Sequence, residues 1–458
     1  MQSSSSITLT VLGGGGEIGA SCFLLGFDGH QVLLDSGTHP KKDGIDALPE
    51  YSLLHRAPEA LLISHAHVDH CGSMPYVMKQ FPTVRTHATL PTTRIMDRML
   101  HNSVSVMELV AKERGVQGYP LYTHDDVNYA MRSVTAHEFQ KPFRLAMDPP
   151  VEAMFQPAGH VLGAASVLLR LPGHTVYYTA DISEGPQELL AGFKPLPANE
   201  KIDTLIIEST HGATEEDKVH DYAAEAQRFG VELTKVLERG GTVLVPSFAL
   251  GRTQEILTMI ARMQEDGVIP QVPVYASGLG RAIYEIYARF EDHLMPESYL
   301  YPLDQFGRIG NVWERSVTEK LIEKPCIIVA TSGMMLENTP SAMIAQEMVK
   351  YTHHGIFFVG YVDPETPGYK LLHAEAGDRL QFSLRAPKVP VMLRDIQRFH
   401  FSAHAPRSTL KSVIDRIRPK NIVYVHGDAP ALAWMQEHTG GGYNSFTPQV
   451  GQTLTLGV

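Results

Sequence analysis

The segment Ser64–Gly72, with the sequence Ser-His-Ala-His-Val-Asp-His-Cys-Gly, constrains this chain more than any other. It directly follows Ala60–Ser64, an apolar run typical of a buried strand. A turn at the end of a strand can direct neighbouring side chains into one cavity, and four such side chains are metal-binding types: His65, His67, Asp69 and His70. Imidazole and carboxylate suit Zn²⁺ or Mn²⁺. One tetrahedral ion cannot take all four and keep a water, so we expect two adjacent metal ions.

Three further candidate ligands occur downstream. His160 lies between Gly159 and Gly163 after an irregular stretch, while Asp181 and His426 each follow a strand-like run. Singly, His160 or His426 would more often be an ordinary polar residue than a ligand. As an ordered set with the His-rich loop, they indicate a metal centre in which the Asp181 carboxylate could bridge both ions.

The order of elements predicts an α/β fold, because strand-like runs alternate with helical patterns along the whole chain. In the first part, helices are expected at 92–114 and 125–139. From about residue 201, each strand-like run is followed by an amphipathic helix, and this order predicts a parallel sheet with crossover helices. The first two such pairs are strand 205–207 with helix 215–239 and strand 242–245 with helix 252–265.

The HxHxDH loop, the glycine-flanked His and the strand-terminal Asp together resemble the motif series of the metallo-β-lactamase superfamily. This resemblance implies that Asp35 supports the metal-binding loop from behind. It implies that one zinc ion is held by His65, His67 and His160. It implies that the other is held by Asp69, His70 and His426, with Asp181 bridging the ions and a hydroxide between them as nucleophile.

More than two hundred residues separate Asp181 from His426, and this insertion resembles a β-CASP domain. The resemblance lies in Leu205–Gly212, Pro246–Glu255 and, just after the insertion, Phe401–Ala405. It implies a metallo-β-lactamase αββα sandwich with an inserted parallel-sheet α/β domain. The expected domain ranges are 1–200 for the first part of the sandwich, 201–390 for the β-CASP domain and 391–458 for the completion of the sandwich.

The same resemblance, to cleavage-and-polyadenylation endonucleases and prokaryotic β-CASP ribonucleases, implies hydrolysis of single-stranded RNA. His404 would be the general acid, held by Glu208, and Asp69 would serve catalysis as well as metal binding. The expected cofactor is two Zn²⁺ ions, with Mn²⁺ as the alternative. The sequence does not decide whether cleavage is internal, proceeds from the 5′ end, or both.

Substrate contacts are expected after the strands of the insertion, where backbone N–H groups and hydroxyls suit phosphate. The residues assigned to substrate binding are Ser332, Gly333, Arg252 and Lys370, and Arg281 and Arg407 are further candidates for a basic groove. Each of these basic side chains could equally be a solvated surface charge. Two departures from the family pattern, Pro406 in place of an Asp and Tyr369 in place of an Arg, put substrate preference in doubt.

Bulk composition leaves the substrate less certain than the metal site. The formal charge of −11 argues weakly against a nucleic-acid binder, although a local basic groove matters more than the sum. Three scattered cysteines and the lack of a signal peptide or apolar span favour a cytoplasmic protein without membrane contact. The expected partner is the RNA substrate, and the choice between a monomer and a homodimer stays open. The alternatives are a DNA-directed β-CASP nuclease, a non-catalytic scaffold subunit and a small-molecule hydrolase.

Overall fold

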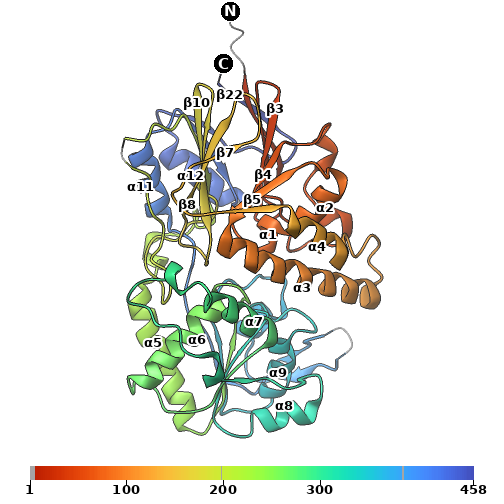
Figure 1. The fold of residues 1–458 in the computed structure, drawn as a ribbon. Helices are drawn as coiled ribbons and strands as arrows, with labels where there is room; N and C mark the ends of the chain where they lie inside the picture. Colours follow the sequence, from red (N-terminus) through yellow and green to blue (C-terminus); the bar gives the residue numbers. More distant parts are fainter. Residues whose placement is uncertain (1–5, 198, 384–385, 458) are drawn as a thin grey trace, which may run out of the picture. The chain divides into compact units, whose positions relative to one another are not determined.

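The chain forms two compact units, shown in Figure 1. The structure is a computed structural model that describes residues 6–197, 199–383 and 386–457. Unit 1 comprises Met1–Pro186, Gly192–Lys218 and Ala403–Val458, and unit 2 comprises Gln187–Ala191 and Val219–Ser402. Unit 1 is therefore assembled from both ends of the chain.

Unit 1 contains two seven-stranded mixed sheets. The first has the order β22 (Thr453–Gly457), β1 (Ile7–Gly13), β2 (Cys22–Phe27), β3 (His30–Leu34), β4 (Ala60–Leu62), β5 (Arg85–Thr89) and β6 (Val134–His137). The second has the order β21 (Asn444–Phe446), β20 (Asn421–Val425), β11 (Thr204–Glu208), β10 (His174–Tyr178), β9 (Ala165–Leu171), β8 (Val151–Pro157) and β7 (Phe143–Leu145). The N- and C-terminal strands pair directly, β1 with β22.

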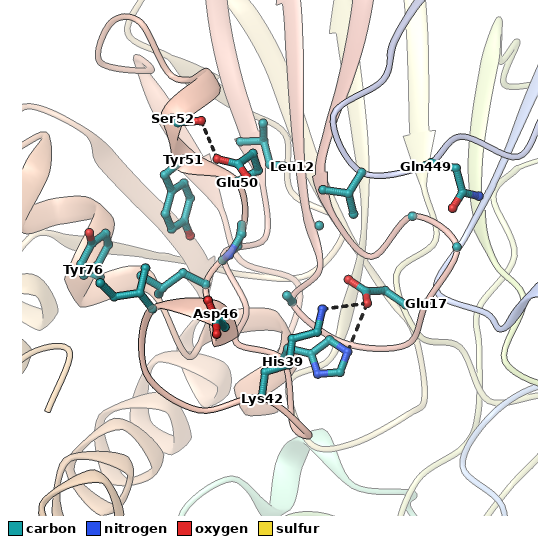
Figure 2. A pocket seen from close by; sticks show the side chains of 18 of the residues that line it. Leu12, Glu17, His39, Lys42, Asp46, Glu50, Tyr51, Ser52, Tyr76 and Gln449 are labelled. Atoms are coloured by element: carbon teal, nitrogen blue, oxygen red, sulfur yellow. Dashed lines mark hydrogen bonds and ion pairs between the residues drawn. The ribbon is translucent and has the colours of Figure 1, made fainter. Parts of the chain in front are cut away.

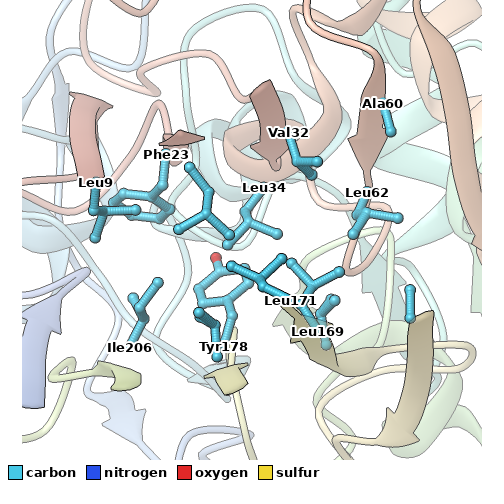
Figure 3. Close-up of a cluster of buried hydrophobic side chains, with 14 of the residues drawn as sticks. Leu9, Phe23, Val32, Leu34, Ala60, Leu62, Leu169, Leu171, Tyr178 and Ile206 are labelled. Carbon is cyan, nitrogen blue, oxygen red and sulfur yellow. The ribbon is translucent and has the colours of Figure 1, made fainter. Parts of the chain in front are cut away.

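The core of unit 1 lies between these two sheets. Figure 3 shows Phe23, Leu34 and Leu62 of the first sheet facing Leu169 and Tyr178 of the second. Alternate strand residues point to one face, so each strand supplies every second residue to this core. Helices complete the four layers: α1 (Val68–Cys71), α2 (Met74–Gln80), α3 (Leu90–Arg114), α4 (His124–Arg132), α11 (Arg407–Ile417) and α12 (Ala429–Thr439).

Unit 2 contains a six-stranded, all-parallel sheet, as the alternating strand and helix pattern predicted. Its order is β14 (Phe306–Arg308), β13 (Val274–Ala276), β15 (Ile327–Ala330), β12 (Val243–Pro246), β16 (Gly355–Phe358) and β19 (Asp395–Arg398). A short pair is formed by β17 (Arg379–Leu380) and β18 (Val389–Pro390). The helices are α5 (Tyr222–Glu238), α6 (Arg252–Glu265), α7 (Gly278–Tyr287), α8 (Arg315–Leu321), α9 (Pro340–Met348) and α10 (Pro367–Leu372).

The structure corrects two expected helices. The helix expected at 125–139 ends at Arg132, because the following residues form β6, which pairs with β5 at the edge of the first sheet. The helix expected at 215–239 begins only at Tyr222, where the Asp221 side chain accepts a hydrogen bond from Ala224 N. By contrast, α6 has the expected bounds of 252–265. In the part of the chain described, no helix is both long and apolar enough to cross a bilayer.

The unit boundaries also differ from the expected ranges of 1–200, 201–390 and 391–458. β11 was expected to begin the insertion, but it pairs with β10 and β20 inside unit 1. β19 was expected to fall after the insertion, but it pairs with β16 at the edge of the parallel sheet of unit 2. Both shifts arise from strand pairing between residues far apart in sequence, which local patterns do not reveal.

Unit 2 also buries a carboxyl group whose charge is only partly compensated. Glu255 of α6 is fully buried, and its Oε2 accepts hydrogen bonds from the backbone N–H groups of Glu188, at 2.6 Å, and Leu189, at 2.9 Å. Its Oε1 has no hydrogen-bond partner among the described residues. Burial raises the pKa of Glu255 to about 7, against the opposing effects of Arg252 and the two N–H groups. The folded state therefore retains this proton at pH values where the unfolded chain has lost it.

Replacing Glu255 with glutamine is expected to remove a pH-dependent loss of stability. The folded state binds the proton of Glu255 more tightly than the unfolded chain does. The stability that this gives is fully present below the pKa of Glu255 in the unfolded chain, and it is lost as the pH rises through about 7, the pKa in the folded protein. Between pH 4.5 and pH 7.5 the wild type should lose on the order of 3 kcal/mol relative to Glu255→Gln. Urea unfolding of both proteins across this range measures the difference, with the exposed Glu323→Gln as the control. Parallel curves for wild type and Glu255→Gln would contradict the assignment.

Candidate functional site

The His-rich loop lies at the carboxyl end of β4 and is held by backbone hydrogen bonds. His67 precedes the short helix α1, which contains Asp69 and His70. Ser36 N donates to His70 O and Thr38 N donates to Val68 O, both at 2.8 Å. The loop therefore rests on the segment after β3, with its backbone positions fixed by residues about thirty positions earlier.

Gly37 allows this close approach. A Cβ atom at Gly37 would lie 1.7 Å from Asp69 O, far inside contact distance. We therefore expect Gly37→Ala to displace the loop and to weaken metal binding. Overpacking of this kind should also lower the free energy of unfolding by about 1–3 kcal/mol. Zinc titration and thermal unfolding test this. Gly185→Ala is the matched control, because a Cβ there meets no atom within 4 Å. Equal zinc affinity in the two variants would refute the expected role.

Asp35, at the end of β3, connects the loop to the opposite sheet. Its Oδ1 accepts from Ser64 N at 2.7 Å, and its Oδ2 accepts from Ser64 Oγ at 2.8 Å and Tyr178 Oη at 2.7 Å. Oδ2 also lies 2.8 Å from His70 Nδ1. A neutral His70 that donates through Nδ1 presents a lone pair at Nε2. Asp35 is therefore fully buried behind the loop and contacts both Ser64 and His70.

All seven predicted ligands converge in unit 1. His160 Nε2 lies 3.0 Å and His65 Nε2 lies 3.1 Å from His67 Nδ1, so these three form one group. Asp69 Oδ2 lies 3.4 Å from His426 Nε2 and 3.8 Å from His70 Nε2, forming a second. The Asp181 carboxylate contacts members of both groups, at 3.3 Å from His70, 3.4 Å from His426, 3.7 Å from His65 and 3.8 Å from His160.

The chemistry of this cluster fits divalent cations. His70 Nε2 and Asp181 Oδ1 are buried polar atoms that make no hydrogen bond among the described residues. Burial lowers the pKa of His65 and of His160, which favours the neutral imidazole that binds metals. Burial also opposes charge on His70, but Asp181 and Asp69 raise its pKa well above the usual value. The carboxylates thus create a negative potential that would stabilise cations among the imidazoles.

The partly exposed His404 and the buried Glu208 form a pair beside this cluster. His404 Nδ1 lies 3.1 Å from Glu208 Oε2, and the other carboxylate oxygen accepts from Ile182 N at 2.7 Å. Burial disfavours the charged imidazole, but the Glu208 carboxylate prevails and raises the pKa of His404 to about 9. The His404 ring centroid lies 4.6 Å from that of His160. The pair therefore places a protonated imidazole next to the metal-binding side chains.

Three stretches of the chain match known domain families. Residues 15–219 match the metallo-beta-lactamase superfamily, residues 253–371 match the Beta-Casp domain, and residues 388–448 match the Zn-dependent metallo-hydrolase RNA specificity domain. The chain is also 30% identical to the transcription termination factor FttA of Methanocaldococcus jannaschii, over 92% of this chain and 67% of that protein. The chain belongs to the β-CASP nucleases of the metallo-β-lactamase superfamily.

Other proteins are similar to most of this chain. An RNase J-like protein of Methanocaldococcus jannaschii is 29% identical, over 92% of this β-CASP chain and 93% of that protein. The cleavage and polyadenylation specificity factor 73 of Drosophila melanogaster is 30% identical over 93% of the chain, which spans only 60% of that factor. A crystal structure of a protein of unknown function from Enterococcus faecalis shares the fold, with a TM-score of 0.56 and 15% identity, covering 98% of this chain and 100% of that one.

The sequence did not predict two side chains, Tyr178 and Thr210, that contact residues of this β-CASP site. Tyr178 donates to Asp35 from 143 positions away, and Thr210 Oγ1 lies 3.1 Å from His426 Nδ1. Tyr178 belongs to a strand-like run and Thr210 lies next to an acidic motif, so each had an ordinary local explanation. Only the packing of one sheet against the other, and the parallel pairing of β11 with β20, bring these partners together.

The residues assigned to substrate binding lie in unit 2 and differ in accessibility. Lys370 is exposed on α10, and Ser332 and Gly333 follow β15. Arg252 is only 5% exposed, and its Nη2 donates to Gln187 Oε1 at 2.8 Å, which does not favour the expected contact with substrate. Arg281, also expected in a basic groove, is buried and donates to the backbone carbonyl of Leu303 at 3.3 Å. Both arginines therefore bond to protein in this structure.

A cavity of about 980 Å³ in unit 1 is separate from the metal ligands. Figure 2 shows its walls, which include the Gly-rich loop after β1 and the side chains of Glu17, His39 and Lys42. Glu17 Oε2 lies 3.1 Å from Lys42 Nζ and 3.3 Å from His39 Nε2. None of the seven predicted ligands lines this cavity. The reaction centre is therefore identified by its metal-binding side chains and not by the size of a pocket.

Proposed function

We propose that this protein is a two-zinc ribonuclease that hydrolyses phosphodiester bonds of single-stranded RNA. The observation that carries the proposal is the convergence of seven metal-binding side chains beside the His404–Glu208 pair. The match of residues 388–448 to an RNA specificity domain, and relatives named as RNases or polyadenylation factors, support RNA as the substrate class.

In this proposal His65, His67 and His160 would hold one ion and Asp69, His70 and His426 would hold the other, and Asp181 contacts residues of both groups. Two ions bound there would stabilise the negative charge that develops on the phosphate during hydrolysis. Asp35 holds His70 in the orientation that presents Nε2 to the site. The Gly37 segment keeps the backbone of Asp69 in place, so the donors are positioned before metal or substrate binds.

His404 supplies the proton that the leaving 3′-oxygen requires. An alkoxide is a poor leaving group, and a positioned acid typically contributes about 10²–10⁴-fold to the rate. Glu208 keeps His404 protonated and orients its ring, while Ile182 N fixes the second oxygen of Glu208. The products would be a 3′-hydroxyl and a 5′-phosphate.

Cleavage of labelled polymers tests this function. Zinc-loaded protein should cut single-stranded RNA, leave DNA of the same sequence largely intact and lose this activity on treatment with a chelator. Cleavage of circular RNA would establish internal attack, whereas activity only on linear RNA with a free 5′ end would establish the exonucleolytic mode. Preferential cleavage of DNA, or hydrolysis of small esters without action on either polymer, would overturn the proposal.

A further inference from the structure

A column of three planar groups lies on the surface formed by α11 and α12, which run side by side in unit 1 (Figure 1). The Arg407 guanidinium carbon lies 4.4 Å from the centroid of the Trp434 ring. The Trp434 ring stacks on His438, with centroids 4.2 Å apart and an interplanar angle of 9°. We call Arg407, Trp434 and His438 the stacked column.

The outer end of the stacked column is accessible and positively charged. His438 and Lys411 are exposed, and Lys411 Nζ lies 3.5 Å from His438 O. At the other end, Arg407 Nε is held 3.5 Å from Glu216 Oε1. The stretch from Arg407 to Lys420 contains five basic residues and one acidic residue, in a chain whose formal charge is −11. The column therefore lies in a local basic region of an acidic protein.

The stacked column begins close to the reaction centre along the chain. Arg407 is the first residue of α11 and follows His404 by three positions, a separation of at most about 10 Å in an extended chain. Planar groups interleaved with basic side chains are the chemistry that proteins use to hold single-stranded nucleic acid, because bases stack on the rings and phosphates contact the cations. A role for the half-buried Trp434 in packing the two helices would not require the exposed His438 ring and the exposed Lys411 at the outer end.

We propose that the stacked column binds a segment of the single-stranded RNA substrate outside the cleavage site. A base stacks at the exposed His438 end and Lys411 contacts a neighbouring phosphate. This inference rests on the proposed ribonuclease function and adds a binding subsite to it. The subsite would increase affinity for long substrates, because a short oligonucleotide in the cleavage site would not extend to the column.

Tryptophan fluorescence tests the column directly, because the chain contains only two tryptophans, Trp313 and Trp434. In a His404→Ala background, which slows cleavage of the RNA during the titration, Trp313→Phe leaves Trp434 as the reporter and Trp434→Phe leaves Trp313. Titration with an oligo(U) of about 16 nucleotides should change Trp434 emission in parallel with binding measured by anisotropy. Trp313 emission should stay constant. Binding without any change in Trp434 emission would overturn the proposal.

Affinity and substrate length provide a second measurement. His438→Ala should weaken binding of the long oligonucleotide about five- to a hundredfold, the range for loss of one stacked base. Lys411→Gln should weaken binding less and reduce its salt dependence. In cleavage assays, KM should rise for long RNA far more than for an oligonucleotide of about 4 nucleotides, with kcat little affected. Equal losses for both lengths would show a structural role and refute the subsite. If wild-type protein cleaves no RNA at all, the ribonuclease function itself fails.

Discussion

Replacing Asp181 with asparagine is expected to remove metal binding and nearly all hydrolytic activity while leaving the metal-free fold intact. The carboxylate contacts imidazoles of both ligand groups, so no other side chain of the cluster links the two proposed sites in the same way. Asparagine keeps the shape but loses the charge that offsets two cations. Because metal-ion stabilisation supplies several kcal/mol to such reactions, activity should fall by about a thousandfold or more.

Metal-free stability separates this effect from misfolding. Asp181 is 2% exposed, and although burial opposes its charge, His426 and His70 prevail and hold the pKa of the carboxyl well below its usual range, so a neutral amide would lose stabilisation that this charge gives the metal-free protein. The metal-free variant should therefore melt at a somewhat lower temperature than the metal-free wild type, still in a single cooperative transition, and the further stabilisation by added zinc should nearly disappear. Zinc content per chain, thermal melting with and without zinc, and RNA cleavage give the three readouts. Asp97→Asn, on the exposed side of α3, is the control. Full zinc content in Asp181→Asn would contradict the proposed site.

The metal cluster was predictable because its signals are local. A buried strand followed closely by His65–His70 predicts where these side chains lie. His426 directly follows β20, and Asp181 lies three residues after β10. Parallel strands of one sheet bring their carboxyl ends to one edge, so strand-terminal residues distant in sequence meet there. The αββα sandwich with an inserted parallel-sheet domain followed from the resemblance carried by these motifs, and the structure and the domain matches confirm that fold.

Features decided by tertiary packing were not predictable in the same way. The end of α4 at Arg132 and the membership of β11 in unit 1 depend on strand pairing, which overrides local helix propensity. Arg252 occupies the motif position from which a substrate contact was expected, yet it is buried against Gln187. A charged residue in a motif indicates that its position matters, but only the surrounding packing shows whether the charge faces solvent or protein.

Replacing His404 with alanine is expected to lower kcat for RNA by about 10²–10⁴-fold without loss of metal. The lost group is the proposed proton donor for the leaving oxygen, and His404 is not among the seven residues assigned to the ions. Glu208→Gln should give a smaller loss, because the imidazole remains but the carboxylate that raises its pKa is gone.

The leaving group distinguishes this role from a general disturbance of the site. Bis(p-nitrophenyl) phosphate releases p-nitrophenolate, which departs without protonation, so His404→Ala should lose far less activity on this ester than on RNA. The zinc content of the variant should equal that of the wild type. The proposed ligand His160 is held by the backbone carbonyl of Ala403, 2.7 Å from its Nδ1, and His404→Ala does not remove this contact. An equal loss of activity on both substrates would show that His404 acts by positioning the metal-binding side chains and not as the proton donor. Loss on RNA alone would establish that the chain's own imidazole delivers the proton.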